Sequence, residues 1–302
     1  MNEVYHIPAM LEQTVDGLNI RPDGTYVDVT FGGGGHSRAI LERLGQNGRL
    51  FSMDQDIDAY HNECAQENRQ LADDNRWQFV HSNFRYLGNF MDYYGVQQID
   101  GLLADLGVSF HHFDSPERGF SFRFSAPLDM RMNQNGGRTA ADILNTYDEE
   151  NLARVLYIYG ELKQSRMLAR KIVTARQKAP ILRTEELVAI LGDEKKTLTL
   201  AFQALRIEVN DELGALREML LTAKALLRKG GHISVLTYHS LEDRIVKNFL
   251  RSGNIEGTIE KDFYGNILTP FRVIEKGINA SEEEINRNPR ARSAKLRIAE
   301  KL

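Results

Sequence analysis

The chain has 302 residues, a formal net charge of −4 and one cysteine. This length suits one large α/β domain or a domain that carries an insertion. The small negative charge argues against a general attraction to nucleic acid, and the lone Cys64 excludes an internal disulfide and fits a reducing compartment. No basic stretch followed by an apolar one opens the chain, and no apolar run reaches membrane-spanning length. We therefore expect a soluble, cytoplasmic protein without a membrane partner.

A glycine-rich stretch joins a strand-like segment to a helix-like segment. Residues 26–31 are half alternating and rich in β-branched side chains, Gly32–Gly35 are four consecutive glycines, and the apolar residues of 37–44 recur at helical spacing. Glycines lose much backbone entropy when they are ordered, whereas a ligand can approach a backbone closely only where side chains are absent. The stretch therefore predicts a cofactor loop, although a plain structural turn has the same local pattern.

The first part of the chain alternates between strands and helices. A short helix is predicted at 9–18, strands at 49–53, 77–81 and 99–104, and another helix at 57–68. Such alternation predicts a parallel sheet, and ligands of such sheets bind at the carboxyl ends of the strands. The side chains expected at these ends are Asp28, Asp54, Phe84 and Asp105. Asp54 follows the last glycine by 19 positions, near the interval expected of a ribose-binding carboxylate.

Helical patterns dominate the middle of the chain. Helices are predicted at 140–146, 149–159, 162–177, 184–191 and 199–210. We interpret residues 116–210 as an inserted helical substrate-recognition domain, and residues 1–115 with 211–302 as a discontinuous catalytic domain. The predicted fold class is thus α/β, a Rossmann-like fold with an inserted all-α domain.

The last part of the chain returns to the sheet. A helix at 212–228, closed by Gly230 and Gly231, leads to a fifth strand at 231–237. Two late runs, near 271–274 and 294–299, predict a terminal hairpin at the edge of the sheet.

Two cofactor classes use a glycine loop with a carboxylate after the second strand, namely nicotinamide dinucleotides and S-adenosylmethionine. A dinucleotide fingerprint that starts at Gly32 would require a third glycine at the position of Ser37. S-adenosylmethionine carries an ammonium group, for which Asp28 is useful, and the edge hairpin also suits a methyltransferase. Methyl transfer is the leading interpretation, with Asp28 and Gly32 among the cofactor-binding residues, and a nicotinamide-dependent Rossmann dehydrogenase is the alternative.

The residues also narrow the atom that receives the methyl group. Methylation at C5 of a pyrimidine requires a cysteine that adds to the ring, and Cys64 is predicted on a helix away from the strand ends. An amino nitrogen needs only a proton acceptor and a line of attack, for which Asp105 is placed. Tyr238 and His239, after the fifth strand, are candidates to line the pocket of the target base.

No metal site is expected, because adjacent histidines such as His111–His112 lack the spacing of two ligands on one face.

Several long motifs resemble one family. They are Asp28–Ser37 (DVTFGGGGHS), Asp105–Ser109 (DLGVS), Glu117–Phe122 (ERGFSF), Pro127–Met132 (PLDMRM), Phe202–Leu213 (FQALRIEVNDEL), His239–Lys247 (HSLEDRIVK) and Asn288–Ser293 (NPRARS). In this order they resemble the RsmH (MraW) family of bacterial 16S ribosomal RNA (cytosine-N4)-methyltransferases, with a weak match only at about 251–280. The resemblance implies S-adenosylmethionine as cofactor and, as substrate, a cytosine near the P site in the decoding centre of the small ribosomal subunit.

The resemblance also implies roles for individual residues. Cofactor contacts are implied at Gly34, Gly35, His36, Asp54, Phe84 and Asp105. His112 stands where the family has a cofactor-contacting glutamine, so it enters the same set. The family's Thr-Arg-Thr before Phe202 is replaced by Thr199–Ala201 (TLA), which removes one cation from the inserted domain.

Basic residues predict where RNA phosphates bind. The tail from Arg287 to Lys301 is locally basic, with Arg290 and Arg292 as RNA-binding candidates, and Arg131 and Arg166 of the inserted domain join them. The target cytosine is expected to be extruded into a pocket beside Asp105.

The oligomeric state is open, and a homodimer is possible. A catalytically silent ribosomal RNA-binding assembly factor is the alternative from a different class.

Overall fold

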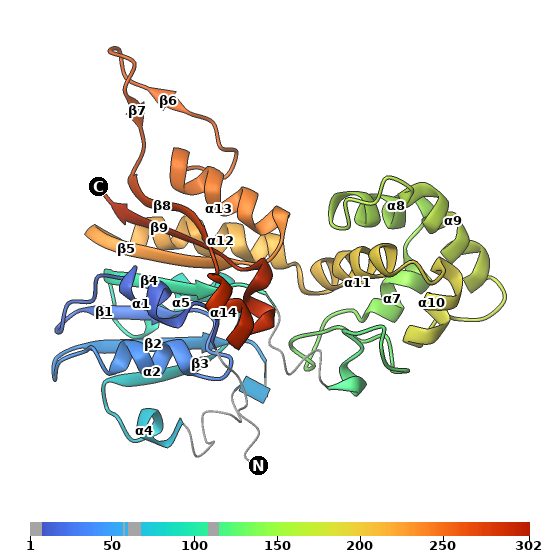
Figure 1. Cartoon of the computed structure of the whole chain (residues 1–302), viewed down its shortest axis with the longest axis horizontal. Coiled ribbons are helices and arrows are strands. Elements are labelled where there is room, and N and C mark those ends of the chain that lie inside the picture. Colours follow the sequence, from blue (N-terminus) through green and yellow to red (C-terminus); the bar gives the residue numbers. More distant parts are fainter. Residues whose placement is uncertain (1–7, 57, 60–67, 108–114) are drawn as a thin grey trace. The chain divides into compact units, whose positions relative to one another are not determined.

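The computed structural model describes residues 8–56, 58–59, 68–107 and 115–302, which form two compact units (Figure 1). Unit 1 consists of Met1–Gly107 with Leu213–Leu302, and unit 2 of Val108–Glu212. Most of the helix predicted at 57–68, including Cys64, lies outside the described residues, and so does His112. The assignment of catalysis to one part of the chain and of substrate recognition to the other stays a prediction.

Unit 1 is built on a seven-stranded sheet of order β3-β2-β1-β4-β5-β9-β8. The strands are β1 (Thr25–Asp28), β2 (Arg49–Asp54), β3 (Trp77–His81), β4 (Ile99–Asp105), β5 (Leu227–Thr237), β8 (Phe271–Asn279) and β9 (Lys295–Lys301). The first five are parallel, whereas β9 is antiparallel to both β5 and β8. This confirms the predicted parallel sheet and its antiparallel edge. The strand order reverses at β1 and β4, where ligands of such sheets bind.

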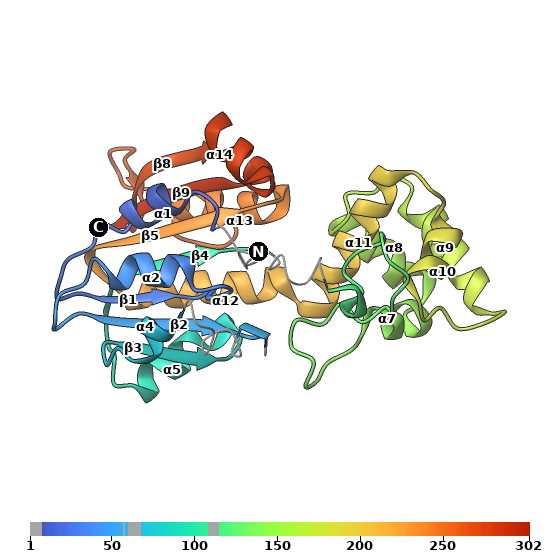
Figure 2. The same ribbon diagram turned by 60° about the horizontal axis from the view of Figure 1, so that its bottom comes forward.

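Helices cover both faces of this sheet, because its strands are apolar on both sides (Figure 1 and Figure 2). The helices of unit 1 and at its border are α1 (Leu11–Asp16), α2 (Gly35–Leu41), α4 (Arg69–Ala72), α5 (Leu87–Tyr93), α12 (Glu212–Leu226), α13 (Ser240–Ser252) and α14 (Glu282–Arg287), with 3₁₀ turns η2 (Phe84–Tyr86) and η4 (Pro289–Ser293). On one face, Val27 and Phe51 share a core with α5, α12 and α13. On the other, the neighbouring Tyr26 and Leu50 pack with α1 and α2. Successive side chains of a strand therefore point to opposite faces of the sheet, and both faces are covered by helices.

The predicted glycine cap of the helix before β5 is wrong. The helix α12 ends at Leu226 and β5 begins at the next residue, so Gly230 and Gly231 lie inside the strand. The register between β4 and β5 shifts beside these glycines, and Gly230 has a φ of +76°. A Cβ at Gly231 would lie 2.9 Å from the carbonyl oxygen of Asp100. The two glycines therefore accommodate an irregularity in the sheet rather than the end of a helix.

Unit 2 has its own apolar core, formed by helices close to the positions that the sequence predicts. They are α7 (Ala140–Thr146), α8 (Glu149–Ile158), α9 (Ser165–Arg176), α10 (Thr184–Leu191) and α11 (Lys195–Asn210), after the 3₁₀ turn η3 (Pro116–Arg118). Thr139 and Asp142 form a reciprocal capping box at the start of α7. α11 begins four positions before its predicted start at 199.

A small hairpin of β6 (Glu260–Lys261) and β7 (Ile267–Leu268) lies between α13 and β8 and extends away from the sheet of unit 1 (Figure 1). Among the helices that the structure describes, none combines the length and the apolar character that crossing a membrane requires.

Candidate active site

Three carboxylates lie at the carboxyl ends of three adjacent parallel strands. Asp28 is the last residue of β1, Asp54 of β2 and Asp105 of β4. Because β1 lies between β2 and β4, Asp28 occupies the central position of the three. The glycine loop follows Asp28 directly and leads into α2, as the sequence predicts.

Asp28 holds the glycine loop from the inside. Its side chain is completely buried, and its Oδ1 accepts hydrogen bonds from the backbone N–H of Thr30 at 3.1 Å and from the hydroxyl of Thr30 at 3.3 Å. The hydroxyl of Ser37 donates to Oδ2 at 2.6 Å. Burial raises the pKa of Asp28 to about 6, and the hydrogen bonds from Ser37 and Thr30 oppose that rise. This arrangement shows that Asp28 organises the loop, and its contact with an ammonium group stays a prediction.

The glycines of the loop differ in what excludes a side chain. Gly32 has a φ of +50°, and no atom of the described residues lies within 4 Å of the place where its Cβ would be. Gly34 has a φ of +76°, and its Cβ would lie 2.6 Å from Oδ1 of Asn68. A Cβ at Gly35 would lie 2.7 Å from Cγ of Pro8. Gly34 and Gly35 are thus required by the packing of the chain itself, whereas Gly32 leaves its backbone open to a ligand.

Asp54 and Phe84 offer the groups that a nucleoside would contact. Oδ2 of Asp54 accepts a hydrogen bond from the N–H of Gly32 at 2.9 Å, and Oδ1 accepts one from the N–H of Asp56 at 3.0 Å. A carboxylate has about four lone-pair sites, so a side chain of this kind can accept from several donors, ribose hydroxyls among them. Phe84, the first residue of η2 after β3, packs partly against the core and stays partly exposed. Cofactor contacts of the two residues stay a prediction.

Asp105 is held by side chains from neighbouring elements. The hydroxyl of Tyr238 donates to Oδ1 of Asp105 at 2.6 Å, and Nδ1 of His36 lies 3.8 Å from Oδ2. The backbone N–H of Asp105 donates to the hydroxyl oxygen of Thr30 at 2.7 Å. Since Thr30 also contacts Asp28, it links the ends of β1 and β4. Sequence reasoning missed Thr30, although an aspartate that accepts a hydrogen bond from the backbone two residues on is a common turn arrangement.

Burial sets the protonation state of this pair. It raises the pKa of Asp105 to about 7, the hydrogen bond from Tyr238 opposes the rise, and the charges of Asp28 and Glu242 add to it. Burial and the nearby Asp105 also hold the pKa of Tyr238 well above its ordinary value. Tyr238 therefore remains a hydrogen-bond donor, and Asp105 exchanges a proton near neutral pH.

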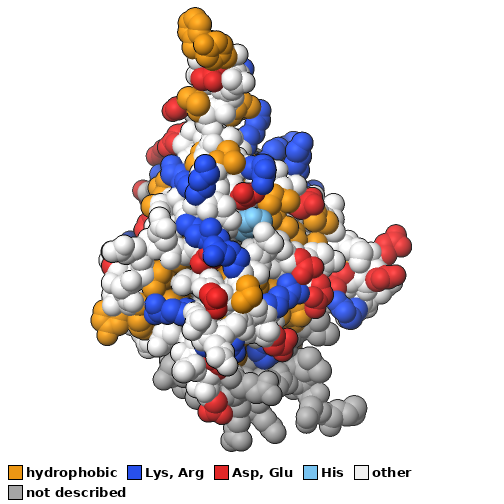
Figure 3. All heavy atoms as spheres, turned by 90° about the vertical axis from the view of Figure 1, so that its left-hand side faces the viewer, with side chains coloured by type: hydrophobic (Ala, Val, Ile, Leu, Met, Phe, Trp, Pro, Cys, Tyr) orange, Lys and Arg blue, Asp and Glu red, His pale blue; other side chains and the backbone are white. Residues whose placement is uncertain are grey.

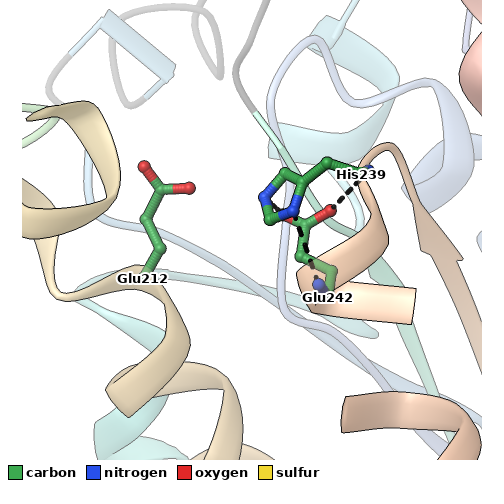
Figure 4. Close-up of side chains that lie close together, drawn as sticks. All are labelled: Glu212, His239 and Glu242. Carbon is green, nitrogen blue, oxygen red and sulfur yellow. Dashed lines mark hydrogen bonds and ion pairs between the residues drawn. The ribbon is translucent and has the colours of Figure 1, made fainter. Parts of the chain in front are cut away.

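His239 caps α13 and is paired with Glu242 (Figure 4). Nδ1 of His239 accepts a hydrogen bond from the N–H of Glu242 at 3.4 Å, and Nε2 lies 3.1 Å from Oε1 of Glu242. Oε2 of Glu242 accepts hydrogen bonds from the N–H groups of Tyr238 at 3.0 Å and His239 at 3.3 Å. The buried Glu242 thus fixes the segment that carries Tyr238. It was missed from the sequence, where its spacing from His239 is that of a capping box.

The predicted RNA-binding arginines are not equivalent. Arg166, Arg290 and Arg292 have exposed side chains. Arg131 instead forms a two-pronged ion pair with Asp129, in which both nitrogen–oxygen distances are 2.8 Å. The guanidinium of Arg131 is thus already engaged within unit 2, and this lowers the pKa of Asp129 despite its partial burial.

Several cations of the basic tail, which the sequence predicts to contact phosphates, are paired within the protein itself. Arg297 is buried in β9 and forms an ion pair with Asp243 of α13 at 2.7 and 3.0 Å. Lys295 lies 3.6 Å from the same carboxylate, and Arg287 is paired with Glu284. The physical reason is that β9 lies between β5 and β8 in the sheet, where a charged side chain needs a partner.

The sheet order, the antiparallel edge, the glycine loop and the strand-end carboxylates define a Rossmann-like methyltransferase. The profile of the MraW methylase family matches residues 3–302. The chain belongs to this family and is a methyltransferase enzyme.

Curated relatives are similar over nearly their whole length. The chain is 58% identical over 304 residues to "Ribosomal RNA small subunit methyltransferase H" of Bacteroides thetaiotaomicron, covering 98% of this chain and 97% of the relative. It is 58% identical over 306 residues to the protein of the same name from Parabacteroides distasonis, with coverages of 99% and 98%. A solved rRNA methylase from Streptococcus thermophilus is 13% identical, with a TM-score of 0.43 and coverages of 98% and 99%.

Proposed function

We propose that the protein transfers a methyl group from S-adenosyl-L-methionine to the exocyclic N4 of a cytidine in the decoding centre, in the P-site region, of 16S ribosomal RNA. The observation that carries this proposal is the hydrogen-bonded pair of Asp105 and Tyr238 at the end of β4. An acceptor of this kind is what methylation of an amine requires. The printed names of the relatives support ribosomal RNA of the small subunit as the substrate class.

The strand-end residues fit a sulfonium cofactor. Asp28, Asp54 and Asp105 together create a negative environment that favours a cation and repels the pyrophosphate of a dinucleotide. The open backbone at Gly32 gives room beside Asp54, and the partly exposed ring of Phe84 offers a surface for adenine. When bound, the cofactor supplies an electrophilic methyl group on sulfur.

Asp105 would orient the amine and take its proton. The N4 lone pair of cytosine is delocalised into the ring, so the carboxylate must hold the amine in line with the methyl group. Positive charge would develop on N4 as it accepts the methyl group, and Asp105 would take the proton that N4 releases. A base whose pKa is about 7 is well matched to this step near neutral pH. Tyr238 fixes Oδ1, so Oδ2, which lies 3.8 Å from Nδ1 of His36, is the oxygen proposed to accept from the amine.

The exposed Arg166, Arg290 and Arg292 are proposed contacts for RNA phosphates, and residues 116–210 are proposed to recognise the substrate. Because RNA bases are read when they are splayed out of their stacks, the target cytosine would be extruded toward Asp105.

Calorimetry with S-adenosylmethionine and with NAD tests the cofactor. The proposal predicts binding of S-adenosylmethionine, and binding of NAD alone would support the dehydrogenase instead. The reaction is tested with labelled cofactor and small ribosomal subunits that lack the modification, followed by nuclease digestion and mass spectrometry. We expect N4-methylcytidine at one position of 16S ribosomal RNA. Cofactor binding without N4-methylcytidine would favour a silent assembly factor.

A further inference from the structure

The turn between β6 and β7 presents two aromatic side chains to solvent. Phe263 is 98% exposed and Tyr264 is 86% exposed. In Figure 3 the apolar tip of the molecule projects at the top, and Lys and Arg side chains gather on the face below it. Exposed aromatic rings at the end of a projecting segment usually mark an interaction site, because burial would otherwise be favourable.

The turn is built to hold its shape. Oδ1 of Asp262 accepts hydrogen bonds from the N–H groups of Tyr264 and Asn266, both at 2.8 Å, and Oδ2 accepts one from the side-chain amide of Asn266 at 2.9 Å. These hydrogen bonds, that of the Asn266 side chain first, lower the pKa of Asp262. Gly265 supplies the left-handed conformation that the turn needs, with a φ of +87°. The two strands pair through only two residue pairs, which would give a hairpin little stability by itself. The hydrogen bonds of Asp262 and the conformation of Gly265 therefore help to stabilise the turn.

The base of the hairpin is fixed to the core of unit 1. The segment leaves α13 and enters β8, and the rings of Phe249 and Phe271, one in each element, have centroids 5.7 Å apart. Asn254 bridges the start of the segment, because its side chain accepts from the N–H of Thr258 at 3.0 Å and donates to its carbonyl oxygen at 2.8 Å. The aromatic tip is therefore held at a defined place.

We infer that this aromatic tip, Phe263 with Tyr264, stacks on unpaired bases of the ribosomal RNA substrate, an inference that rests on the proposed function. The two rings are nearly perpendicular, at 88° with centroids 5.7 Å apart, so they do not stack on each other and each keeps a face for a base. Lys261 on the hairpin and Lys276 on β8 are exposed and suit a phosphate backbone, whereas Glu260 and Asp262 beside the rings leave the tip itself to base stacking rather than to phosphate binding.

A protein partner fits the tip less well. A standard protein interface buries about 800 Å² on each side, and a two-stranded hairpin of this length provides only part of that area. Base stacking needs only one exposed ring for each base and no large surrounding surface. The tip therefore suits single-stranded RNA better than a folded protein.

The test compares binding of the full chain to small ribosomal subunits and to protein-free 16S ribosomal RNA, without cofactor. Phe263→Ala combined with Tyr264→Ala should weaken binding to both by tenfold or more. The control Tyr93→Ala, which removes another ring of unit 1 that is 80% exposed, should bind like the wild type. Unchanged binding of the double variant would overturn the inference. Weakened binding to subunits alone would also overturn it, because the partner would then be a ribosomal protein.

A second readout reports stacking directly. Tryptophan fluorescence of Tyr264→Trp should be quenched by an unstructured adenine oligonucleotide, as expected for an indole stacked on a base. No quenching by the oligonucleotide, or a spectral shift with anionic lipid vesicles alone, would contradict the inference. Neither readout needs methyl transfer. A protein that bound RNA through the tip but formed no N4-methylcytidine would refute the proposed function and leave this inference standing.

Discussion

The strand-end site and the predicted RNA-contacting arginines differ in how the chain holds them. Asp28, Asp54 and Asp105 end adjacent parallel strands, and hydrogen bonds from the backbone or from hydroxyl groups fix each of them. Among the arginines, Arg131 is neutralised by an ion pair, whereas Arg292 is exposed. Sheet topology thus determines where the strand-end carboxylates lie. Whether an arginine can bind a phosphate depends instead on the ion pairs that its own side chain forms.

The largest effect is expected from Asp105→Asn. The amide keeps an oxygen that can accept from Tyr238 but is no base, so kcat/KM should fall about 10²–10⁴-fold, the range for loss of a general base. Single-turnover methylation assays measure this change, with cofactor and RNA binding determined in parallel. A loss of less than tenfold with intact binding would remove Asp105 from the mechanism.

Arg297→Ala tests whether the tail is structural. The change leaves the partly buried Asp243 with a weaker counter-charge, and breaking a buried pair costs about 3–5 kcal/mol of unfolding free energy. Urea unfolding measures the loss. Arg292→Ala is the matched control and should unfold like the wild type, because its side chain is exposed. Equal stability of the two variants would contradict the distinction.

The pH dependence of stability tests the burial of the two carboxylates. The pKa values of Asp28 and Asp105 are raised to about 6 and about 7, so between about pH 4, the ordinary pKa of an aspartate, and these values the folded state binds more protons than the unfolded state. Stability is then greatest near pH 4–5 and falls as pH rises toward 7, by on the order of 2–4 kcal/mol between pH 5 and 7. Unfolding experiments over this range should show a smaller fall in Asp105→Asn. An equal fall in both proteins would assign the effect to other groups.

Tyr238→Phe should have a smaller effect on activity. Loss of a hydrogen bond to a charged group costs about 1.5 kcal/mol or more, so kcat/KM should fall roughly tenfold at neutral pH. The same bond opposes the raised pKa of Asp105, so its loss should move the acid limb of the pH profile to higher pH. Steady-state assays from pH 6 to 9 measure both changes. An acid limb at the wild-type position would show that Tyr238 does not act through Asp105.

The smallest effects are expected at exposed cations. Arg290→Ala and Arg292→Ala should each weaken RNA binding a few-fold and lower the salt slope by about one. Arg131→Ala should change the salt slope less, because Asp129 already neutralises its guanidinium. Filter binding at several salt concentrations compares the three variants. A larger change of slope for Arg131→Ala would contradict the comparison.

The sequence predicted most of the sheet because alternating strands and helices permit few topologies. The same reasoning placed Asp28, Asp54 and Asp105 at strand ends. It could not show that Asp28 turns inward, because the hydroxyl of Ser37 reaches it only after the glycine loop has folded.

Two further features of the fold could not be predicted, because they depend on which strands pair in the sheet. Arg297 is buried because β9 inserts between β5 and β8, and Gly230–Gly231 lie in a strand because β4 extends the pairing of β5 toward α12. The local pattern predicted a strand at 294–299 without the burial of Arg297, and it placed Gly230 at the end of a helix. Glu242 was within reach of sequence reasoning, since its capping-box spacing from His239 is visible.

The most direct test of the central claim is the pH dependence of kcat/KM for the cofactor, measured as N4-methylcytidine formed on small subunits. This ratio reports groups of the free enzyme. The rate should rise about tenfold per pH unit below an apparent pKa of about 7 and level off above it, and Asp105→Asn should lose this limb. A wild-type profile that is flat between pH 5.5 and 8, or a limb that persists in Asp105→Asn, would contradict the assignment of Asp105 as the proton acceptor.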